Sequence, residues 1–195
     1  MQSLAAGLAG RKNLATLSLN FYACGNIGDG GMQSLAASLA ELKSLETLGL
    51  SFKGTNVGDV LMLQLGAELP QLKILASLIL NFESCKNIGD VGLQKFGAGL
   101  AELKTLETLS LDLRECIEIG DVGLQELGAG VAELKSLATL SWDFAMCNKI
   151  GDVGMQELGA GFAQLKNLAT LSLNFAECRD IGYVGLQKCG AGLES

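Results

Sequence analysis

Two hydrophobic periodicities alternate along the chain. In "LSLNF", which begins at Leu17, apolar and polar residues alternate, and this pattern predicts a strand with one buried face. In "DVGLQKFGAGLAELK", which begins at Asp90, apolar residues recur at spacings of three and four, which predicts an amphipathic helix. Asp90 stands where a helix N-cap is expected, because its carboxylate can accept hydrogen bonds from the free N–H groups of the first turn. We therefore expect each strand to lead through a turn into a helix.

Both patterns recur with a fixed period. The aspartate of the motif "CGNIGDGGM" returns at intervals of 30 or 31 residues, as Asp29, Asp59, Asp90, Asp121 and Asp152, with Tyr183 in sixth place. The shorter interval locates one missing residue between Leu48 and Asp59. A fixed period in this range over a whole chain predicts a solenoid of stacked units. Because helical crossovers join the strands, the strands must run parallel, with the helices on the outside of the curve.

The repeated unit resembles a leucine-rich repeat. "LETLSLDLRECIEIGDVGLQEL", which begins at Leu106, joins LxxLxL to CxxIGDxGLxxL. The turn half resembles the cysteine-containing class and the helix half is similar to the ribonuclease-inhibitor class, although four residues separate Leu111 from Cys116, where the cysteine class has two. The resemblance implies an α/β fold, a right-handed horseshoe of about six 31-residue repeats. Its parallel strands lie on the concave face and its helices on the convex face. We expect one such domain over residues 1–195, starting and ending inside a repeat helix.

Composition narrows the classes of function. The chain has 49% hydrophobic and 18% charged residues, as a folded protein does, and its formal net charge of -7 gives no attraction for nucleic acid or an anionic membrane. It contains no histidine, which excludes mechanisms that need an imidazole base or ligand. No apolar run approaches the roughly 18 residues of a membrane span. Six cysteines without a secretory signal predict reduced thiols and an intracellular, cytoplasmic location.

The turn motif is interpreted as scaffold and not as a ligand site. One cysteine per unit would form a linear row, whereas a zinc site needs converging ligands, so we expect these thiols to pack the turn against the backbone of the next unit. A redox-sensitive pair is the alternative. Six stacked glycine turns without a nearby lysine likewise disfavour a phosphate loop. The row comprises Cys24, Cys85, Cys116, Cys147 and Cys178, with Thr55 near this place in the shortened unit.

Three further positions carry structural expectations. A glycine recurs on the buried stripe of the predicted helices, as in Gly97 and Gly128, and predicts close helix packing. Pro70 replaces an alanine of the other units and predicts the last turn of its helix or a slight bend. Trp142 replaces a strand leucine, so we expect it in the core.

The outward strand residues are the better candidates for binding. Trp, Tyr and Arg are favoured at interface hot spots, which singles out Tyr22 and Arg114. Asp112 and Asp143 are expected to be like-charged neighbours on adjacent strands, either simply solvated or compensated by a cation or by a partner's Arg or Lys. The predicted partner-binding residues are Asn20, Tyr22, Ser51, Lys53, Asn81, Glu83, Asp112, Arg114, Asp143 and Asn174.

These observations favour a non-catalytic scaffold that binds a protein partner through the concave strand face. We expect no catalytic residue, metal or cofactor. The alternative is a structural accessory subunit of a larger complex, or part of a longer repeat array, that docks through its end coils or its helical face. The two hypotheses differ in which surface carries the binding.

Overall fold

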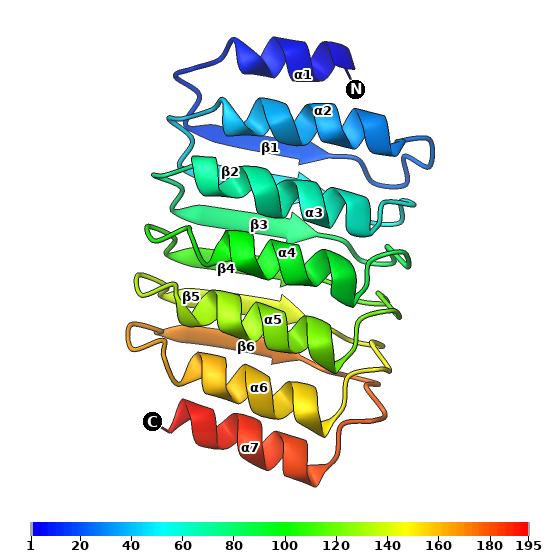
Figure 1. Cartoon of the computed structure of the whole chain (residues 1–195), viewed down its shortest axis with the longest axis vertical. Coiled ribbons are helices and arrows are strands. Elements are labelled where there is room, and N and C mark those ends of the chain that lie inside the picture. Colours follow the sequence, from blue (N-terminus) through cyan, green and yellow to red (C-terminus); the bar gives the residue numbers. More distant parts are fainter. Residues whose placement is uncertain (1, 195) are drawn as a thin grey trace.

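The strands form one layer and the helices cover one side of it. The computed structural model describes residues 2–194, and in this part of the chain six parallel strands make a single sheet in the order β1-β2-β3-β4-β5-β6. Each strand is followed by a helix that lies beside the helix of the preceding repeat (Figure 1). The α/β repeat solenoid expected from the sequence is therefore confirmed.

The element bounds follow the predicted period. The strands are β1 (Thr16–Asn20), β2 (Thr47–Ser51), β3 (Ser77–Asn81), β4 (Thr108–Asp112), β5 (Thr139–Asp143) and β6 (Thr170–Asn174). The α-helices of residues 2–194 are α1 (Gln2–Ala9), α2 (Asp29–Ala40), α3 (Asp59–Glu68), α4 (Asp90–Leu100), α5 (Asp121–Ala132), α6 (Asp152–Phe162) and α7 (Tyr183–Leu193). A short 3-10 helix, Leu69–Gln71, follows α3 and contains Pro70, so the proline does mark the end of its helix.

The core lies between the two layers. The inward leucines of the middle strands, such as Leu78 and Leu109, are fully buried, and each such side chain contributes about 1.5–3 kcal/mol on leaving water. Those of the outer strands, such as Leu171 of β6, are partly buried. Trp142 is also buried, as expected, with its ring perpendicular to that of Phe144. Phenylalanines that follow the strands form two stacks, Phe21 on Phe52 on Phe82 and Phe144 on Phe175, with Leu113 between them. Apolar burial thus runs along the whole stack.

Glycine allows the helices to approach one another closely. A Cβ atom added at Gly130 of α5 would overlap the carbonyl oxygen of Gly97 in α4, and Gly161 of α6 stands in the same relation to Gly128. Only backbone separates adjacent helices at these points, so a side chain would force them apart. The close packing predicted from the helix glycines is confirmed.

The aspartates at the helix starts do not cap their own helices. The N-cap residues are glycines, among them Gly89, and they make no side-chain cap. Asp90 is instead the first residue of α4, and its Oδ1 accepts hydrogen bonds from the N–H groups of Gly120 at 2.8 Å and Gly123 at 2.9 Å in the next repeat. Asp59, Asp121 and Asp152 bond the following repeat in the same way. The N-cap prediction was wrong, and these carboxylates join one repeat to the next. For Asp29 the side chain lies outside the described residues.

The cysteine row bonds in the opposite direction. Cys147 Sγ donates to the carbonyl oxygen of Leu113 at 3.3 Å, in the preceding repeat and not in the next one as expected. Burial is the main reason that the pKa of the Cys147 thiol is raised to about 12. Thr55 replaces the cysteine at the equivalent position, because its N–H bonds Phe52 as the N–H of Cys85 bonds Phe82. Cys24 was expected to be buried but is exposed, since no described strand lies on the outer side of β1.

Candidate functional site

The strand register brings the predicted binding residues together at the carboxyl ends of the strands, on the open face of the sheet. Asp112 and Asp143, the last residues of β4 and β5, are direct register partners, and so are Asn81 and Asp112. The backbone pairing continues beyond the strands, where the N–H of Gly54 bonds the carbonyl of Glu83 and that of Ser84 bonds the carbonyl of Arg114. This pairing aligns the side chains that follow the strands in a second row: Tyr22, Lys53, Glu83, Arg114, Ala145 and Ala176.

The last residues of the six strands form the first row: Asn20, Ser51, Asn81, Asp112, Asp143 and Asn174. All but Ser51 have a structural role that sequence reasoning missed. Asn81 Oδ1 accepts the N–H of Glu83 at 3.0 Å, and Asp112 Oδ1 accepts the N–H of Arg114 at 3.1 Å. Asn20, Asp143 and Asn174 make the same bond to the residue two positions on. A positive φ follows each of these turns, as at Ser84. Asn and Asp favour such turns, which is the signal that could have identified this role.

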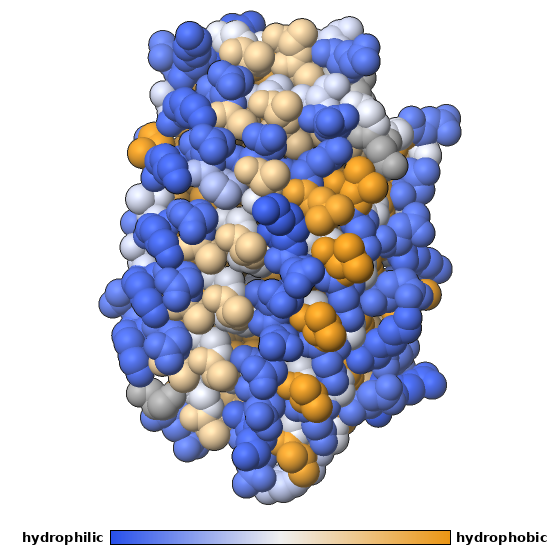
Figure 2. All heavy atoms as spheres, in the orientation of Figure 1, coloured by the Kyte–Doolittle hydropathy of each residue, from blue (hydrophilic) through white to orange (hydrophobic). Residues whose placement is uncertain are grey.

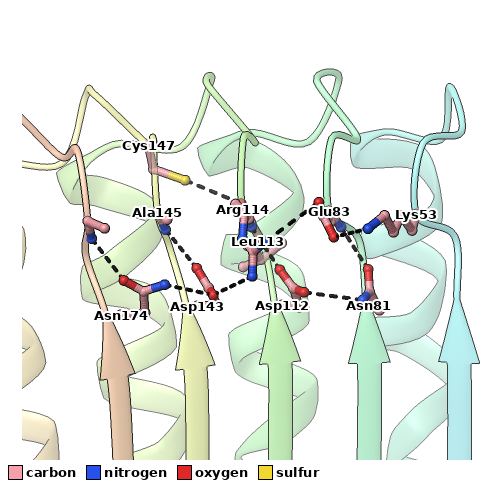
Figure 3. Close-up of polar contacts among 11 residues, drawn as sticks. Lys53, Asn81, Glu83, Asp112, Leu113, Arg114, Asp143, Ala145, Cys147 and Asn174 are labelled. Atoms are coloured by element: carbon pink, nitrogen blue, oxygen red, sulfur yellow. Dashed lines mark hydrogen bonds and ion pairs between the residues drawn. The ribbon is translucent and has the colours of Figure 1, made fainter.

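Charged side chains form a continuous network along the second row. Lys53 Nζ lies 2.6 Å from Glu83 Oε2, and Arg114 Nη1 lies 3.8 Å from Glu83 Oε1. On its other side Arg114 Nη2 lies 2.9 Å from Asp143 Oδ2, to which the Asn174 amide also donates at 2.9 Å (Figure 3). The network therefore extends from the turn after β2 to the end of β6. Its charges come from the turns that follow β2, β3 and β4 and from the last residue of β5.

The two aspartates of the pair differ in their environment. Burial alone would raise the pKa of Asp143, but hydrogen bonds from Arg114, Ala145 and Asn174 together outweigh it and lower that pKa. For Asp112 burial dominates and raises the pKa, although the N–H of Arg114 opposes this, and the negative charge of Asp143 adds to it. Arg114 of the chain itself, and not a partner, thus compensates Asp143. Asp112 Oδ2 receives the amide of Asn81 at 3.2 Å.

Tyr22 and Ser51 lie outside the charged network. Tyr22 is exposed, and its ring lies 5.9 Å from Lys53 Nζ, within cation–π range. Ser51 ends β2 between Asn20 and Asn81 and lines a shallow hollow on the sheet face. Gly49 and Ile79 also line this hollow, and the side chain of Ile79 is exposed. The signal for this hollow was present in the sequence, since a Gly and an Ile interrupt a column of serines.

The thiols and carboxylates of the described residues form no group of three or more that could hold a metal ion. The cysteines are all free thiols, and apart from Cys189 of α7 they lie one per repeat, except in the second repeat, where Thr55 takes this place. None of the helices between residues 2 and 194 has the length and apolar content needed to cross a membrane. Within this part of the chain, the open sheet face is where charged side chains from several strands meet.

Comparison with known proteins identifies the repeat. Residues 78–97 and 140–159 match a family described as Leucine Rich repeat. No curated protein matches the sequence. Among solved structures, the chain is similar to a chain in the crystal structure of the Rad7 and Elc1 complex in yeast, with 13% sequence identity, a TM-score of 0.30, and coverage of 99% of this chain and 73% of that chain.

Proposed function

We propose that this chain, two segments of which match the leucine-rich repeat family, is a non-catalytic scaffold that binds another protein through its open sheet face. The residues of the proposed site are the two rows described above, with Asp112 at their centre. We propose that a basic side chain of the partner binds Asp112. Leucine-rich repeat domains generally mediate protein–protein interaction, which is consistent with this assignment.

One observation carries the proposal. The network contains two acidic and two basic side chains that are engaged with one another: Lys53 with Glu83, and Arg114 with Glu83 and Asp143. Asp112 is a third acidic side chain beside this network. Asp112 forms no ion pair with any residue between 2 and 194, although burial and, to a smaller extent, its neighbour Asp143 disfavour its negative charge and raise its pKa. A partner's lysine or arginine would relieve this repulsion, and charge-assisted hydrogen bonds are among the stronger contacts at an interface.

The neighbouring surface suits an extended segment of a partner protein. Ile79 precedes Asn81 by two residues on β3 and therefore points to the same open face. It offers an apolar contact beside the hollow at Gly49. A partner that places a basic side chain at Asp112 and an apolar one at Ile79 would lie across β3 and β4. Both contacts need only the sheet face, without any movement of the helices.

The alternative, an accessory subunit that docks through the helical face, is favoured by a stripe of exposed valines. Each helix from α3 to α7 carries a valine at its second residue, and these side chains form an apolar column along the molecule (Figure 2). The valines are Val60, Val91, Val122, Val153 and Val184, with exposed fractions between 41% and 63%. Such a column over several repeats would suit an elongated partner.

A displayed peptide library distinguishes the two surfaces. We expect the native protein to select peptides that contain a lysine or arginine near an apolar residue, and Asp112→Asn to bind them about tenfold more weakly. Glu102→Gln removes one exposed acidic charge away from the sheet face and serves as the matched control. The double variant Val122→Gln and Val153→Gln tests the helical face. Selected peptides that lack a basic residue, or that bind Asp112→Asn as tightly as Glu102→Gln, would refute the role of Asp112.

A further inference from the structure

A hollow lies on the edge of the solenoid, beyond the carboxyl ends of the strands. The turns that lead from strand to helix stand side by side there (Figure 3). The turns after β3, β4, β5 and β6 line the hollow, and its volume is about 280 Å³. The residues of the two rows on the sheet face do not line it. Among the lining residues are Lys86, Glu115, Ile117, Met146, Glu177 and Arg179.

The four turns have the same backbone path. The N–H of Glu115 bonds the carbonyl oxygen of Ala145, and the N–H of Met146 bonds that of Ala176. The residue before each turn cysteine has a positive φ, which is 60° at Glu115 and 65° at Met146. Side chains directly before the cysteines and directly after them therefore occupy equivalent positions in every turn. Before the cysteine stand Ser84, Glu115, Met146 and Glu177, and after it stand Lys86, Ile117, Asn148 and Arg179.

Two apolar side chains interrupt these otherwise polar positions. Met146 and Ile117 come from neighbouring turns, line the same hollow and are each 41% exposed. Glu115 and Glu177 adopt the backbone conformation of Met146, so the fold does not require an apolar residue there. Apolar side chains gathered on the surface are typical of a binding site, and the flexible thioether of methionine adapts to a partner.

The turns hold the hollow in shape by their own hydrogen bonds. The N–H of Cys116 bonds the carbonyl oxygen of Leu113 at 3.0 Å, and the N–H of Ile119 bonds that of Cys116 at 3.1 Å. The turn of Cys147 repeats both bonds. A hollow formed in advance loses little conformational freedom when a ligand enters it, which favours binding.

Lys86 is the charged side chain of the hollow that lacks a bound partner. Arg179 Nη2 lies 3.5 Å from Glu177 Oε2, and Glu115 Oε2 accepts the hydroxyl of Ser84 at 3.0 Å. Lys86 is exposed and forms no ion pair with any residue between 2 and 194. A carboxylate of a bound molecule would therefore meet a cation that is not yet engaged.

We propose that this hollow binds a segment of a second protein in which an apolar side chain stands next to an aspartate or glutamate. The apolar side chain enters beside Ile117 and Met146, and the carboxylate pairs with Lys86. A cavity of roughly 150 Å³ can hold a benzene molecule, so the hollow has room for a large apolar side chain. Binding here uses neither Asp112 nor the sheet face, so this proposal and the proposed function can fail separately.

A displayed peptide library with counter-selection tests the proposal. The native protein is the target, and the double variant Ile117→Lys and Met146→Glu is the competitor in solution, which removes peptides that bind only the sheet face. Both substitutions introduce residues that equivalent turns already carry, and together they leave the net charge unchanged. We expect selected peptides to carry an apolar residue within two positions of an acidic one and to bind with dissociation constants on the order of 10 µM.

Single variants assign the contacts. Met146→Glu and Ile117→Lys should each weaken peptide binding at least about tenfold, and Lys86→Gln about threefold. Ile74→Ser removes an exposed isoleucine before β3, and Lys95→Gln removes an exposed cation of α4, so both serve as matched controls and should leave binding unchanged. Circular dichroism checks that every variant is folded. Selected peptides that lack an acidic residue, or that bind Met146→Glu as tightly as Ile74→Ser, would overturn the proposal.

Oxidation of Met146 gives a second readout that needs no variant. Met146 is exposed, whereas Met32, Met62 and Met155 are buried. Hydrogen peroxide transfers one oxygen atom to the Met146 sulfur and is itself reduced to water. A saturating selected peptide should slow this reaction at least about fivefold, as measured by mass spectrometry of the fragment that contains Met146. An unchanged rate would contradict binding in the hollow. Self-association of the native protein that the double variant abolishes would make a second copy the occupant and would also overturn the proposal.

Discussion

Arg114 and Asp143 join adjacent strands by a short ion pair. Nη2 of Arg114, just after β4, lies 2.9 Å from Oδ2 of Asp143 at the end of β5 (Figure 3). The same guanidinium faces Glu83 on its other side at 3.8 Å. One cation thus holds two acidic side chains of two flanking repeats, and the pKa of Arg114 is raised, chiefly by its hydrogen bond to Asp143.

Removing this cation should destabilise the protein at neutral pH. In Arg114→Met, Glu83 and Asp143 lose their common partner, and we expect the free energy of unfolding to fall by about 1 kcal/mol, the upper part of the range for exposed ion pairs. The lowered pKa of Asp143 means that its stabilisation is present above the ordinary pKa of an aspartate and is lost as pH falls through the lowered value. Urea unfolding at pH 7 and at about pH 2 should therefore show a larger difference at the higher pH.

An isolated ion pair provides the control for that measurement. Lys104 and Glu133 lie 3.2 Å apart on the surface, and both side chains are more than half exposed. Lys104→Met should change the free energy of unfolding by less than about 0.5 kcal/mol at either pH. Equal losses in Arg114→Met and Lys104→Met would contradict a special role for the network.

Neutralising Asp112 should have the opposite effect on stability. Asparagine already occupies this position at Asn81 and Asn174, where its Oδ1 accepts the same turn bond. Asp112→Asn keeps that acceptor and removes a half-buried negative charge and its repulsion from Asp143, but it loses the bond from the Asn81 amide to Oδ2, so we expect a net gain of no more than about 0.5 kcal/mol at pH 7. The raised pKa of Asp112 means that protonation stabilises the native protein. The gain should therefore shrink as pH falls and vanish below the ordinary pKa of an aspartate, about 3.9.

The Asp112→Asn result also bears on function. A variant that unfolds at higher urea concentration yet binds selected basic peptides more weakly would separate binding from folding, because loss of stability could not explain the loss of affinity. A drop in stability at pH 7 would instead show that the Asp112 carboxylate is needed for the fold.

Helix spacing should be sensitive to single methyl groups. Gly130→Ala places a Cβ against the carbonyl oxygen of Gly97, and we expect a loss of about 2 kcal/mol, since overpacking outweighs the better helix propensity of alanine. Gly7→Ala in α1, where the added Cβ meets nothing within 4 Å, should instead be neutral or stabilising by up to about 1 kcal/mol. Thermal unfolding of the two variants side by side measures this contrast, and similar melting temperatures would contradict it.

The regular repeat explains why so much of the fold could be predicted. The alternating pattern around Leu17 and the fixed period placed each strand, and the register from Asn20 to Asn174 follows at every step. The predicted helix starts differ from the observed ones by one residue. This difference decides whether Asp90 caps its own helix or bonds the next repeat. Periodicity gives the position of a side chain within its repeat but not which neighbouring repeat it bonds.

The site was harder to predict for a related reason. The sequence aligned Arg114 with Lys53 and Glu83. Their side chains can contact one another because the backbone pairing continues beyond the strands, and the structure was needed to show this. The turn bonds of Asn81 and Asp112 depend on torsion angles that a single sequence does not specify. The repeats with Asn or Asp at this position share these torsion angles. Once one such turn is recognised, the others can therefore be identified.

The aspartate bonds and the cysteine bonds join each repeat to opposite neighbours, and this determines how the molecule can vary in length. Asp90 bonds the following repeat, and Cys147 bonds the preceding one. A whole repeat can therefore be duplicated or deleted with every such contact regenerated at the new junction. The single residue missing after Thr55 is tolerated because it falls in a turn, between the two bonding positions of its repeat. Growth by whole units conserves both junctions, whereas a shift of one residue within a strand or helix would break them.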